Sequence, residues 1–389
     1  MNTTILKEIA EISSGQGAPQ GNKYFGSEGA PFIRAGSLDF LQAGGNEDYL
    51  KKINDETAKK FKLRLYQKGT IIFAKSGMSA TKDRVYVLKT PCYIVSHLAA
   101  IVPEKEEYSQ FLKYWFRQFR PSQLIKDKSY PSIRLTDIEE IKIPNIPDST
   151  KYKVVSILEK CESAIEKRKE ANRLTNEFLK STFLEMFGDP IKNPKNWEAD
   201  KIDNVIEKIT NENPEMFPDK IYDYIDISSI ANNLKTIAQV KNLKGSMAPS
   251  RARQIVISGD ILVSTVRPNL NAVAIVPDNL NNPIASTGFC VLRSDRNLIR
   301  KEYLFEICKM SYFINSLTKI AKGASYPAVS DSDVRNIVIP MPPLSEQRKF
   351  ADIVQKVEKL KEKQKESEKE LNNLFNSLMQ KSFKGELFQ

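Results

Sequence analysis

The sequence predicts an α+β protein in which two globular domains alternate along the chain with two long helices. Three observations lead to this fold class. A central segment recurs near the end of the chain, two long segments combine helical apolar spacing with dense charge, and the other parts hold short β-branched runs between turn residues. With 389 residues, the chain is long enough for two or three domains that each bury a core.

The internal repeat is the strongest of these observations. The segment 129–187 recurs as 325–383 at a constant offset of 196, and both copies begin with Ser-Tyr-Pro. Within this segment, 20 of the 59 positions are identical. Such self-similarity at a long period indicates a duplication and outweighs local propensity.

Upstream of this segment the two halves match more loosely but in the same order. Residues 68–73 resemble 258–263 at an offset of 190, and residues 32–34 resemble 224–226 at an offset of 192. The drift in offset indicates insertions and deletions. Each half is therefore a variable globular part followed by a better-preserved segment, and we divide the chain into a first globular domain (1–148), a central long helix (149–188), a second globular domain (189–344) and a C-terminal long helix (345–389).

The globular parts read as mixed sheet and helix. Gly, Asn, Asp and Pro turns separate short runs that are rich in β-branched and aromatic residues. The predicted strands are 70–73, 84–88, 222–227, 255–257, 261–266 and 272–276, and the predicted helices are 108–119 and 298–318.

The two better-preserved segments read as helices because their apolar residues recur at spacings of three and four. In the first, Val154 and Leu158 begin such a series, and in the second Ile353 and Val357 do. A helix of about 38 residues is roughly 55 Å long, which corresponds to about 16 base pairs of DNA. Two such helices can pair as a coiled coil.

Composition and charge narrow the class of protein. The chain carries 59 Lys+Arg against 48 Asp+Glu, a formal net charge of +11, which favours an anionic partner such as nucleic acid. No segment approaches the roughly 18 apolar residues of a membrane span, and the first residues lack the pattern of a secretion signal. We therefore expect a cytoplasmic protein without membrane contact. The four cysteines are too scattered for a disulfide framework or a paired-Cys zinc site.

Motifs for catalysis are missing. His97 is the only histidine, so a His-based triad or a multi-histidine metal site cannot be built, and packing is its favoured interpretation. The Gly-rich segment 15–23 lacks the spacing of a phosphate loop. The only Pro-Pro, at 342–343, lacks the neighbouring acceptor and aromatic residue with which an amino-DNA methyltransferase holds a flipped base. We predict a protein that is not an enzyme and that binds no cofactor or metal itself.

Recognition of DNA is the remaining interpretation. Arg and Asn can read base edges in bidentate fashion, whereas Lys and Ser mostly contact phosphates. The matched strands 71–74 and 261–264 lead into basic and amide-rich turns at equivalent places, and the repeated tyrosines follow lysines. Solvated loops and a structural turn are the alternatives. The candidate DNA-binding residues are Arg34, Lys75, Ser76, Lys82, Arg84, Lys128 and Tyr130 in the first half, and Arg251, Arg253, Arg267, Asn269, Asn271, Lys322 and Tyr326 in the second.

In these features the sequence resembles the DNA-specificity subunit of type I restriction-modification systems. The resemblance is carried by Ser-Tyr-Pro at 325–327, by Ile-Val-Ile-Pro-Met-Pro-Pro-Leu-Ser-Glu-Gln at 337–347 and by the long charged helix after it. The first half keeps Ser-Tyr-Pro and Ile-x-Ile-Pro but departs from the motif at 145–151. Segments 15–19 and 30–34 also resemble the start of the family's recognition domain, so the resemblance covers essentially the whole chain.

The resemblance implies a fold, a function and partners. It implies two target recognition domains related by a pseudo-twofold axis, with the long helices pairing as an antiparallel coiled coil. Each domain is expected to read one half of a bipartite, gapped target in double-stranded DNA, while the helices set the spacer and dock methyltransferase subunits. The implied partners are two methyltransferase subunits, which would bind S-adenosylmethionine, and translocating endonuclease subunits.

Two alternatives stay open. In the first alternative, the chain is the specificity partner of a combined restriction-methylation enzyme. In the second, it is an autonomous DNA-binding or coiled-coil scaffold protein. Neighbouring genes distinguish the first alternative, and tight sequence-specific binding without any partner distinguishes the second.

Overall fold

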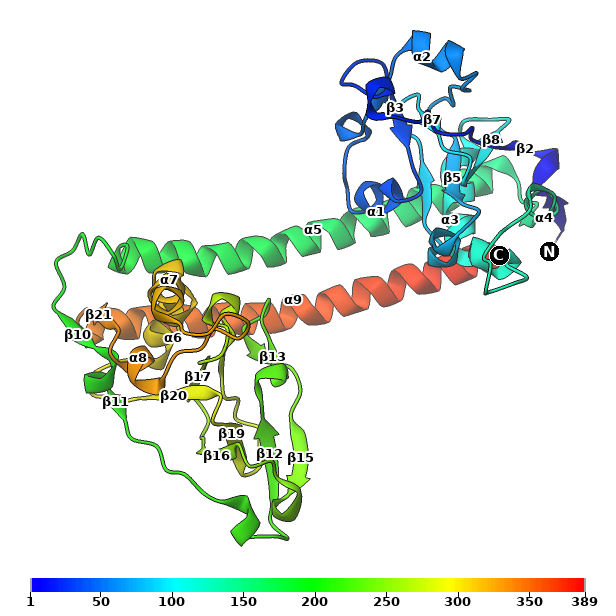
Figure 1. Cartoon of the computed structure of the whole chain (residues 1–389). Coiled ribbons are helices and arrows are strands. Elements are labelled where there is room, and N and C mark those ends of the chain that lie inside the picture. Colours follow the sequence, from blue (N-terminus) through cyan, green and yellow to red (C-terminus); the bar gives the residue numbers. More distant parts are fainter. Residues whose placement is uncertain (1, 388–389) are drawn as a thin grey trace. The chain divides into compact units, whose positions relative to one another are not determined.

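The computed structural model describes residues 2–387 and divides into two compact units (Figure 1). Unit 1 contains the described residues up to Lys169 and from Glu366 onward, and unit 2 contains Glu170–Lys365. The two long helices, α5 (Asp148–Phe187) and α9 (Leu344–Lys384), each give one end to each unit. The predicted α+β class with two globular parts and two long helices is confirmed. Among the residues described, no helix is both long and apolar enough to cross a bilayer.

Unit 1 is built around a four-stranded antiparallel sheet with the order β2-β8-β5-β6. A second sheet has the order β4-β3-β7, and β1 pairs with β9. The strands of unit 1 are β1 (Thr3–Ile5), β2 (Ala10–Ser14), β3 (Ala30–Ile33), β4 (Lys52–Ile53), β5 (Ile71–Ala74), β6 (Val85–Val87), β7 (Tyr93–Ile94), β8 (Leu98–Pro103) and β9 (Lys142–Pro144). Its helices besides α5 and α9 are α1 (Ser37–Gln42), α2 (Asp55–Lys60), α3 (Tyr108–Phe119) and α4 (Leu135–Glu139).

Unit 2 repeats this plan. Its central sheet has the order β11-β20-β17-β18, its second sheet β15-β12-β19-β16, and β10 pairs with β21. The strands of unit 2 are β10 (Ala199–Lys201), β11 (Ile206–Glu207), β12 (Ile221–Ile225), β13 (Ile230–Ala231), β14 (Thr236–Ile237), β15 (Lys241–Lys244), β16 (Ala252–Ile255), β17 (Ile261–Ser264), β18 (Val273–Ile275), β19 (Pro283–Ser286), β20 (Phe289–Ser294) and β21 (Val338–Pro340). Its further helices are α6 (Lys301–Lys309), α7 (Ser311–Ile320) and α8 (Asp331–Arg335).

The two units share one topology, which confirms the repeat. Strands β5 and β17 lie second from the edge of equivalent antiparallel sheets, and they are the strands matched at offset 190. The parallel pair β3–β7 corresponds to β12–β19, and the terminal pair β1–β9 corresponds to β10–β21. The loose sequence match upstream of the Ser-Tyr-Pro segment therefore reflects structural equivalence.

The apolar runs of β5 and β17 follow from burial on both faces. Ile71 and Phe73 point into a core shared with α3 and the long helices, whereas Ile72 and Ala74 point into a second core with β3 and β7. Alternate side chains of a strand lie on opposite faces, so a strand between two cores is apolar throughout. Unit 2 repeats this division, since Ile261 and Val263 face one core and Leu262 the other.

The long helices pair within each unit. In unit 2, Thr175 of α5 bonds to Gln364 of α9, while Phe183 contacts Phe350 with ring centroids 5.5 Å apart. Residue numbers rise along α5 as they fall along α9, so the pairing is antiparallel, as the resemblance implied. In unit 1 the repeat-equivalent apolar positions pack together, namely Val154, Leu158, Cys161 and Ile165 of α5 with Phe375, Met379 and Phe383 of α9.

One predicted helix is divided in the structure. The segment 298–318 forms α6 and α7, which are separated by Met310 in an extended conformation with ψ 151°. The side chain of Asn271 donates a hydrogen bond to the Lys309 carbonyl at the end of α6 (3.3 Å). This bond satisfies one of the carbonyl groups that a helix leaves free at its C-terminus. A contact from a distant turn thus helps to end the helix where the apolar spacing alone continues.

Candidate nucleic-acid interface

In unit 1 the loop that leaves β5 is bonded to the repeated Ser-Tyr-Pro turn. We call residues 75–82 the strand-exit loop of unit 1 and residues 129–131 its Ser-Tyr-Pro turn. The Gly77 amide donates to the Pro131 carbonyl (2.9 Å), and the Ile133 amide donates to the Lys75 carbonyl (2.7 Å). Backbone polar groups leaving a sheet need new partners, and the turn supplies them. Tyr130 is thereby held beside the strand-exit loop.

Unit 2 contains the same arrangement with different side chains. Its strand-exit loop is 265–271 and its Ser-Tyr-Pro turn is 325–327. The Arg267 amide donates to the Pro327 carbonyl (2.7 Å), and the Val329 amide donates to the Thr265 carbonyl (2.9 Å). These are the bonds of unit 1 displaced by the offsets of the repeat. The shared Ser-Tyr-Pro sequence is therefore explained by a backbone junction that both units need.

Both turns present an aromatic ring to solvent next to basic side chains. Tyr130 is 80% exposed and Tyr326 is 68% exposed. Lys82 and Lys128 are exposed in unit 1, and Lys322 and Asn269 are exposed in unit 2. An exposed aromatic ring near basic side chains suits a sugar-phosphate backbone or an exposed base.

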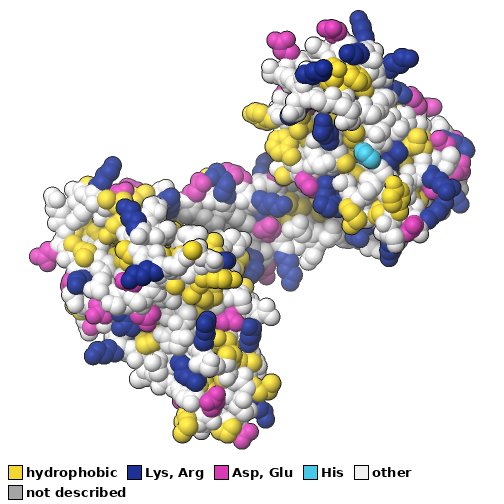
Figure 2. All heavy atoms as spheres, viewed as in Figure 1, with side chains coloured by type: hydrophobic (Ala, Val, Ile, Leu, Met, Phe, Trp, Pro, Cys, Tyr) yellow, Lys and Arg dark blue, Asp and Glu magenta, His cyan; other side chains and the backbone are white. Residues whose placement is uncertain are grey.

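The strand-exit loop of unit 1 also bonds to His97, a residue that is not among the candidate DNA-binding residues predicted from the sequence. Ser76 Oγ lies 2.7 Å from His97 Nδ1, and the Lys75 amide donates to the His97 carbonyl (2.9 Å). The expectation that His97 serves packing is wrong, because its side chain is exposed and is visible at the surface in Figure 2 (cyan). The position of His97 directly before β8, a buried strand that pairs with β5, is the feature of the sequence that could have placed it beside the strand-exit loop.

In unit 2 the strand-exit loop places an arginine over the tyrosine of the Ser-Tyr-Pro turn. The Arg267 guanidinium carbon lies 4.6 Å from the centroid of the Tyr326 ring. Its Nη2 also donates to the Ser325 carbonyl (3.3 Å). A guanidinium over an aromatic face is attracted by the ring quadrupole, so the exposed Arg267 side chain has two partners within the fold.

Other candidate residues have contacts within the fold. Arg84 is 6% exposed and its Nε lies 2.6 Å from Asp39 Oδ1, so its guanidinium is committed to an internal ion pair. Asn271 ends the strand-exit loop of unit 2, where its side chain bonds to Lys309 and its carbonyl accepts a hydrogen bond from Lys235. Burial, together with the charge of Lys309, lowers the pKa of Lys235.

The remaining candidates lie in the second sheets or next to them. The Arg34 guanidinium lies 5.0 Å from the centroid of Phe25, after the end of β3. Arg251 is exposed directly before β16, and its carbonyl accepts a hydrogen bond from the Thr287 amide (2.8 Å). Arg253 is half-buried, and its Nη1 donates to the Ala252 carbonyl (3.1 Å). In the part of the chain that the structure describes, none of these three makes a hydrogen bond or ion pair with a Ser-Tyr-Pro turn.

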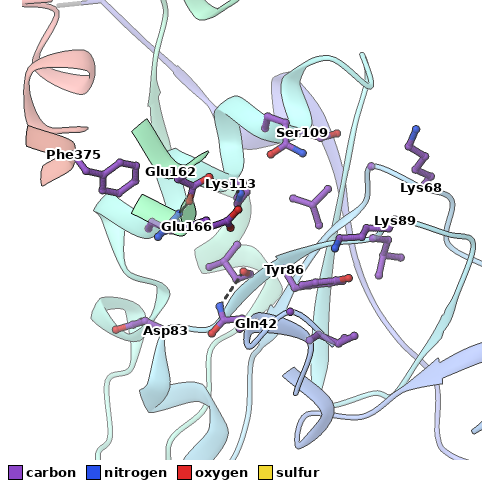
Figure 3. A pocket seen from close by; sticks show the side chains of 18 of the residues that line it. Gln42, Lys68, Asp83, Tyr86, Lys89, Ser109, Lys113, Glu162, Glu166 and Phe375 are labelled. Carbon is purple, nitrogen blue, oxygen red and sulfur yellow. Dashed lines mark hydrogen bonds and ion pairs between the residues drawn. The ribbon is translucent and has the colours of Figure 1, made fainter. Parts of the chain in front are cut away.

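A hollow in unit 1 has a different character. It has a volume of about 1350 Å³, lies among β6, α3 and α5, and contains none of the candidate residues (Figure 3). An ion-pair cluster lies in it, since Lys113 lies 3.4 Å from Glu162 and Arg117 also pairs with that carboxylate. Burial alone would raise the pKa of Glu162, but the hydrogen bond from Tyr114 and the charges of Lys113 and Arg117 outweigh it and lower the pKa. The ion pairs and the hydrogen bond to Glu162 therefore join α3 to α5, and they account for these groups without a ligand.

Taken together, a duplicated α+β fold that repeats an exposed basic and aromatic surface defines a bipartite nucleic-acid-binding protein. The model of the type I restriction modification DNA specificity domain matches residues 1–176 and again residues 194–373. The chain therefore belongs to this family. Each match spans one globular part and most of one long helix, in agreement with the repeat.

Relatives and a solved structure agree with this assignment. The chain is 22% identical over 383 residues to the type I restriction enzyme MjaIX specificity subunit of Methanocaldococcus jannaschii, covering 90% of this chain and 85% of the relative. It is 26% identical over 137 residues to the HindI specificity subunit of Haemophilus influenzae, covering 35% and 29%. The crystal structure of the type I restriction-modification S subunit from M. genitalium matches 98% of this chain and 96% of that chain with a TM-score of 0.58. At 13% identity, this last likeness shows the fold.

Proposed function

We propose that this chain is the non-catalytic DNA-recognition subunit of a type I restriction-modification complex, in which each unit reads one half of a bipartite, gapped target. The observation that carries the proposal is the repeated junction between strand-exit loop and Ser-Tyr-Pro turn. It gives each unit an exposed tyrosine beside basic or amide side chains at the same place in the fold. The relatives, which are named specificity subunits, support the same conclusion.

The chemistry of the two surfaces supports a division of labour. Lys75, Lys82 and Lys128 in unit 1 and Lys322 in unit 2 suit phosphate contacts, which fix the position of a protein on the duplex without reading sequence. Arg and Asn side chains suit base edges. Because the loops are anchored by main-chain bonds, their side chains can differ between units without loss of the fold.

Methylation and cleavage would come from partner subunits. We infer two methyltransferase subunits, which bind S-adenosylmethionine, and endonuclease and translocase subunits in the full complex. The long helices would set the spacer between half-sites and dock the methyltransferase subunits. Roughly 40 helical residues span about 60 Å, a length that corresponds to about 18 base pairs.

The test is co-expression with the methyltransferase encoded beside this chain, followed by mapping of methylated adenines. Exchanging residues 251–271 for the same segment of another family member is expected to change one half of the target and leave the other half intact. Matched heptads inserted after Lys169 in α5 and after Lys365 in α9 are expected to lengthen the spacer by about three base pairs, since seven residues add roughly 10 Å. A change in both half-sites after the exchange, or an unchanged spacer after the insertion, would refute the respective part of the proposal.

A further inference from the structure

Arg267 has an unusual backbone conformation for its residue type. Its φ of 50° and ψ of 60° lie in the left-handed region, which glycine, and at times Asn or Asp, adopts but which is disfavoured for arginine. At the equivalent position of unit 1 stands Gly77, with φ 72° and ψ −176°, a conformation that is essentially restricted to glycine. Unit 2 thus keeps a large side chain at a position where its fold would accept glycine without strain.

Neither burial nor an ion pair explains why an arginine stands at position 267. The Arg267 side chain is exposed, and no acidic side chain pairs with it among the described residues. Its backbone is held by the bond from its amide to Pro327 and by the bond from the Leu270 amide to its own carbonyl (2.9 Å). Strain that surrounding bonds maintain around an exposed side chain is typical of a functional position.

The contacts of the guanidinium hold it in place and leave donors free. Its carbon lies over the Tyr326 ring, and Nη2 donates one hydrogen atom to the Ser325 carbonyl. Arginine has five N–H donors in a planar fork, so the other in-plane donors remain available. Two parallel donors from such a fork match the O6 and N7 acceptors of guanine in the major groove.

We propose that Arg267 reads a guanine in the half-site bound by unit 2 and that Tyr326 is the positioning residue for its guanidinium. This inference rests on the proposed function and adds the base and the residue that reads it. Unit 1 has no counterpart at this position, because Gly77 carries no side chain. Its half-site is therefore read by other groups, and the two surfaces differ in specificity although both loops form the same main-chain bonds to their Ser-Tyr-Pro turns.

The experiment compares variants of the full chain in complex with its methyltransferase, by selection from a random DNA pool and by titration of the selected target. Arg267→Gly relieves the left-handed backbone, so its melting temperature should equal or exceed that of the wild type. Its preference for guanine at one position of one half-site should fall by about 10-fold or more. Arg296→Ala, which removes a charge from an exposed loop of the same unit, is the matched control and should leave the preference unchanged.

Modified bases and the tyrosine variants sharpen the test. Replacing that guanine by 7-deazaguanine, which lacks N7, should weaken wild-type binding but not Arg267→Gly binding, and inosine, which keeps O6 and N7, should be tolerated. Tyr326→Leu should reduce the guanine preference, and Tyr326→Phe should restore it because the ring is kept. An equal loss of affinity for all sequences in Arg267→Gly, or an unchanged preference, would overturn the inference. A wild-type complex without any sequence preference would instead refute the proposed function.

Discussion

A buried polar contact joins the long helices within unit 2, and its removal gives a graded test of the structure. Gln364 Nε2 donates to Thr175 Oγ1 (3.0 Å), and the Thr175 hydroxyl donates to the Ala171 carbonyl (2.8 Å). The two side chains are 6% and 9% exposed, and Gln364 Oε1 has no partner among the described residues. Thr175→Val should leave the whole Gln364 carboxamide unpaired, at a cost of about 1–3 kcal/mol.

The double variant Thr175→Val/Gln364→Leu should recover this loss. Replacing both partners of a buried hydrogen bond by apolar groups of similar shape is close to neutral, and here it also removes the unpaired Gln364 oxygen. For a mid-range cost of about 2 kcal/mol, the single variant should melt about 4–8 °C lower, since 1 kcal/mol shifts Tm by roughly 2–4 °C for 150–250 residues. The double variant should melt close to the wild type.

Thermal and urea unfolding followed by circular dichroism measure both effects. Thr318→Val is the matched control, because the exposed Thr318 in α7 makes the same bond to a carbonyl one turn earlier (2.7 Å) and, among the described residues, its side chain makes no hydrogen bond to another helix. It should change stability by less than about 0.5 kcal/mol. A double variant as unstable as Thr175→Val would show that the loss comes from packing and would refute this account of the contact.

Three further predictions concern stability and are checked by unfolding of the purified chain. Arg293→Ala should cost about 3–5 kcal/mol, because it leaves Asp260, 1% exposed and bonded to Arg293 Nη2 at 2.7 Å, as an unpaired buried charge, whereas Arg296→Ala should be nearly neutral. Phe183→Ala, which removes a fully buried ring from the helix-pair core of unit 2, should cost about 3–5 kcal/mol, and a loss below 1 kcal/mol would contradict the described packing. Because its pKa is lowered, the Glu162 carboxylate stabilises the folded chain above pH 4.5, its ordinary pKa, and this stabilisation is lost as the pH falls through the folded-state pKa. Glu162→Gln should therefore weaken the dependence of stability on acidic pH. Equal acid dependence in both proteins would contradict this.

The architecture was predictable because the repeat carries long-range information within one sequence. Segments that match at a fixed offset must occupy equivalent places, so the order of the central sheet in one unit predicts that in the other. The helix 108–119 has its predicted bounds because its apolar spacing faces one core along its whole length. The break at Met310 was not predictable, since it depends on Asn271 reaching the end of α6 from a distant turn.

The site was predictable in its location more than in its side chains. The strands matched at offset 190 lead into both strand-exit loops, and the Ser-Tyr-Pro turns lie beside those loops. Pairing between distant residues was hidden, so the sequence suggested a free cation at Arg84, although its guanidinium is buried and paired with the exposed Asp39. The left-handed conformation of Arg267 was hidden as well, because nothing in the residue type indicates a positive φ.

The anchoring of the strand-exit loops explains how one fold can carry two different recognition surfaces. The two bonds that join each loop to its Ser-Tyr-Pro turn run between main-chain groups, so they do not depend on which side chains the loop carries. Gly77 in unit 1 and Arg267 in unit 2 therefore donate equivalent hydrogen bonds while presenting different chemistry to solvent. A duplicated domain of this kind can diverge in its exposed residues without loss of the junction that positions them. Conversely, a substitution that breaks the junction, such as Pro at position 77 or 267, removes the donating amide and should abolish recognition by that unit whatever the neighbouring side chains are.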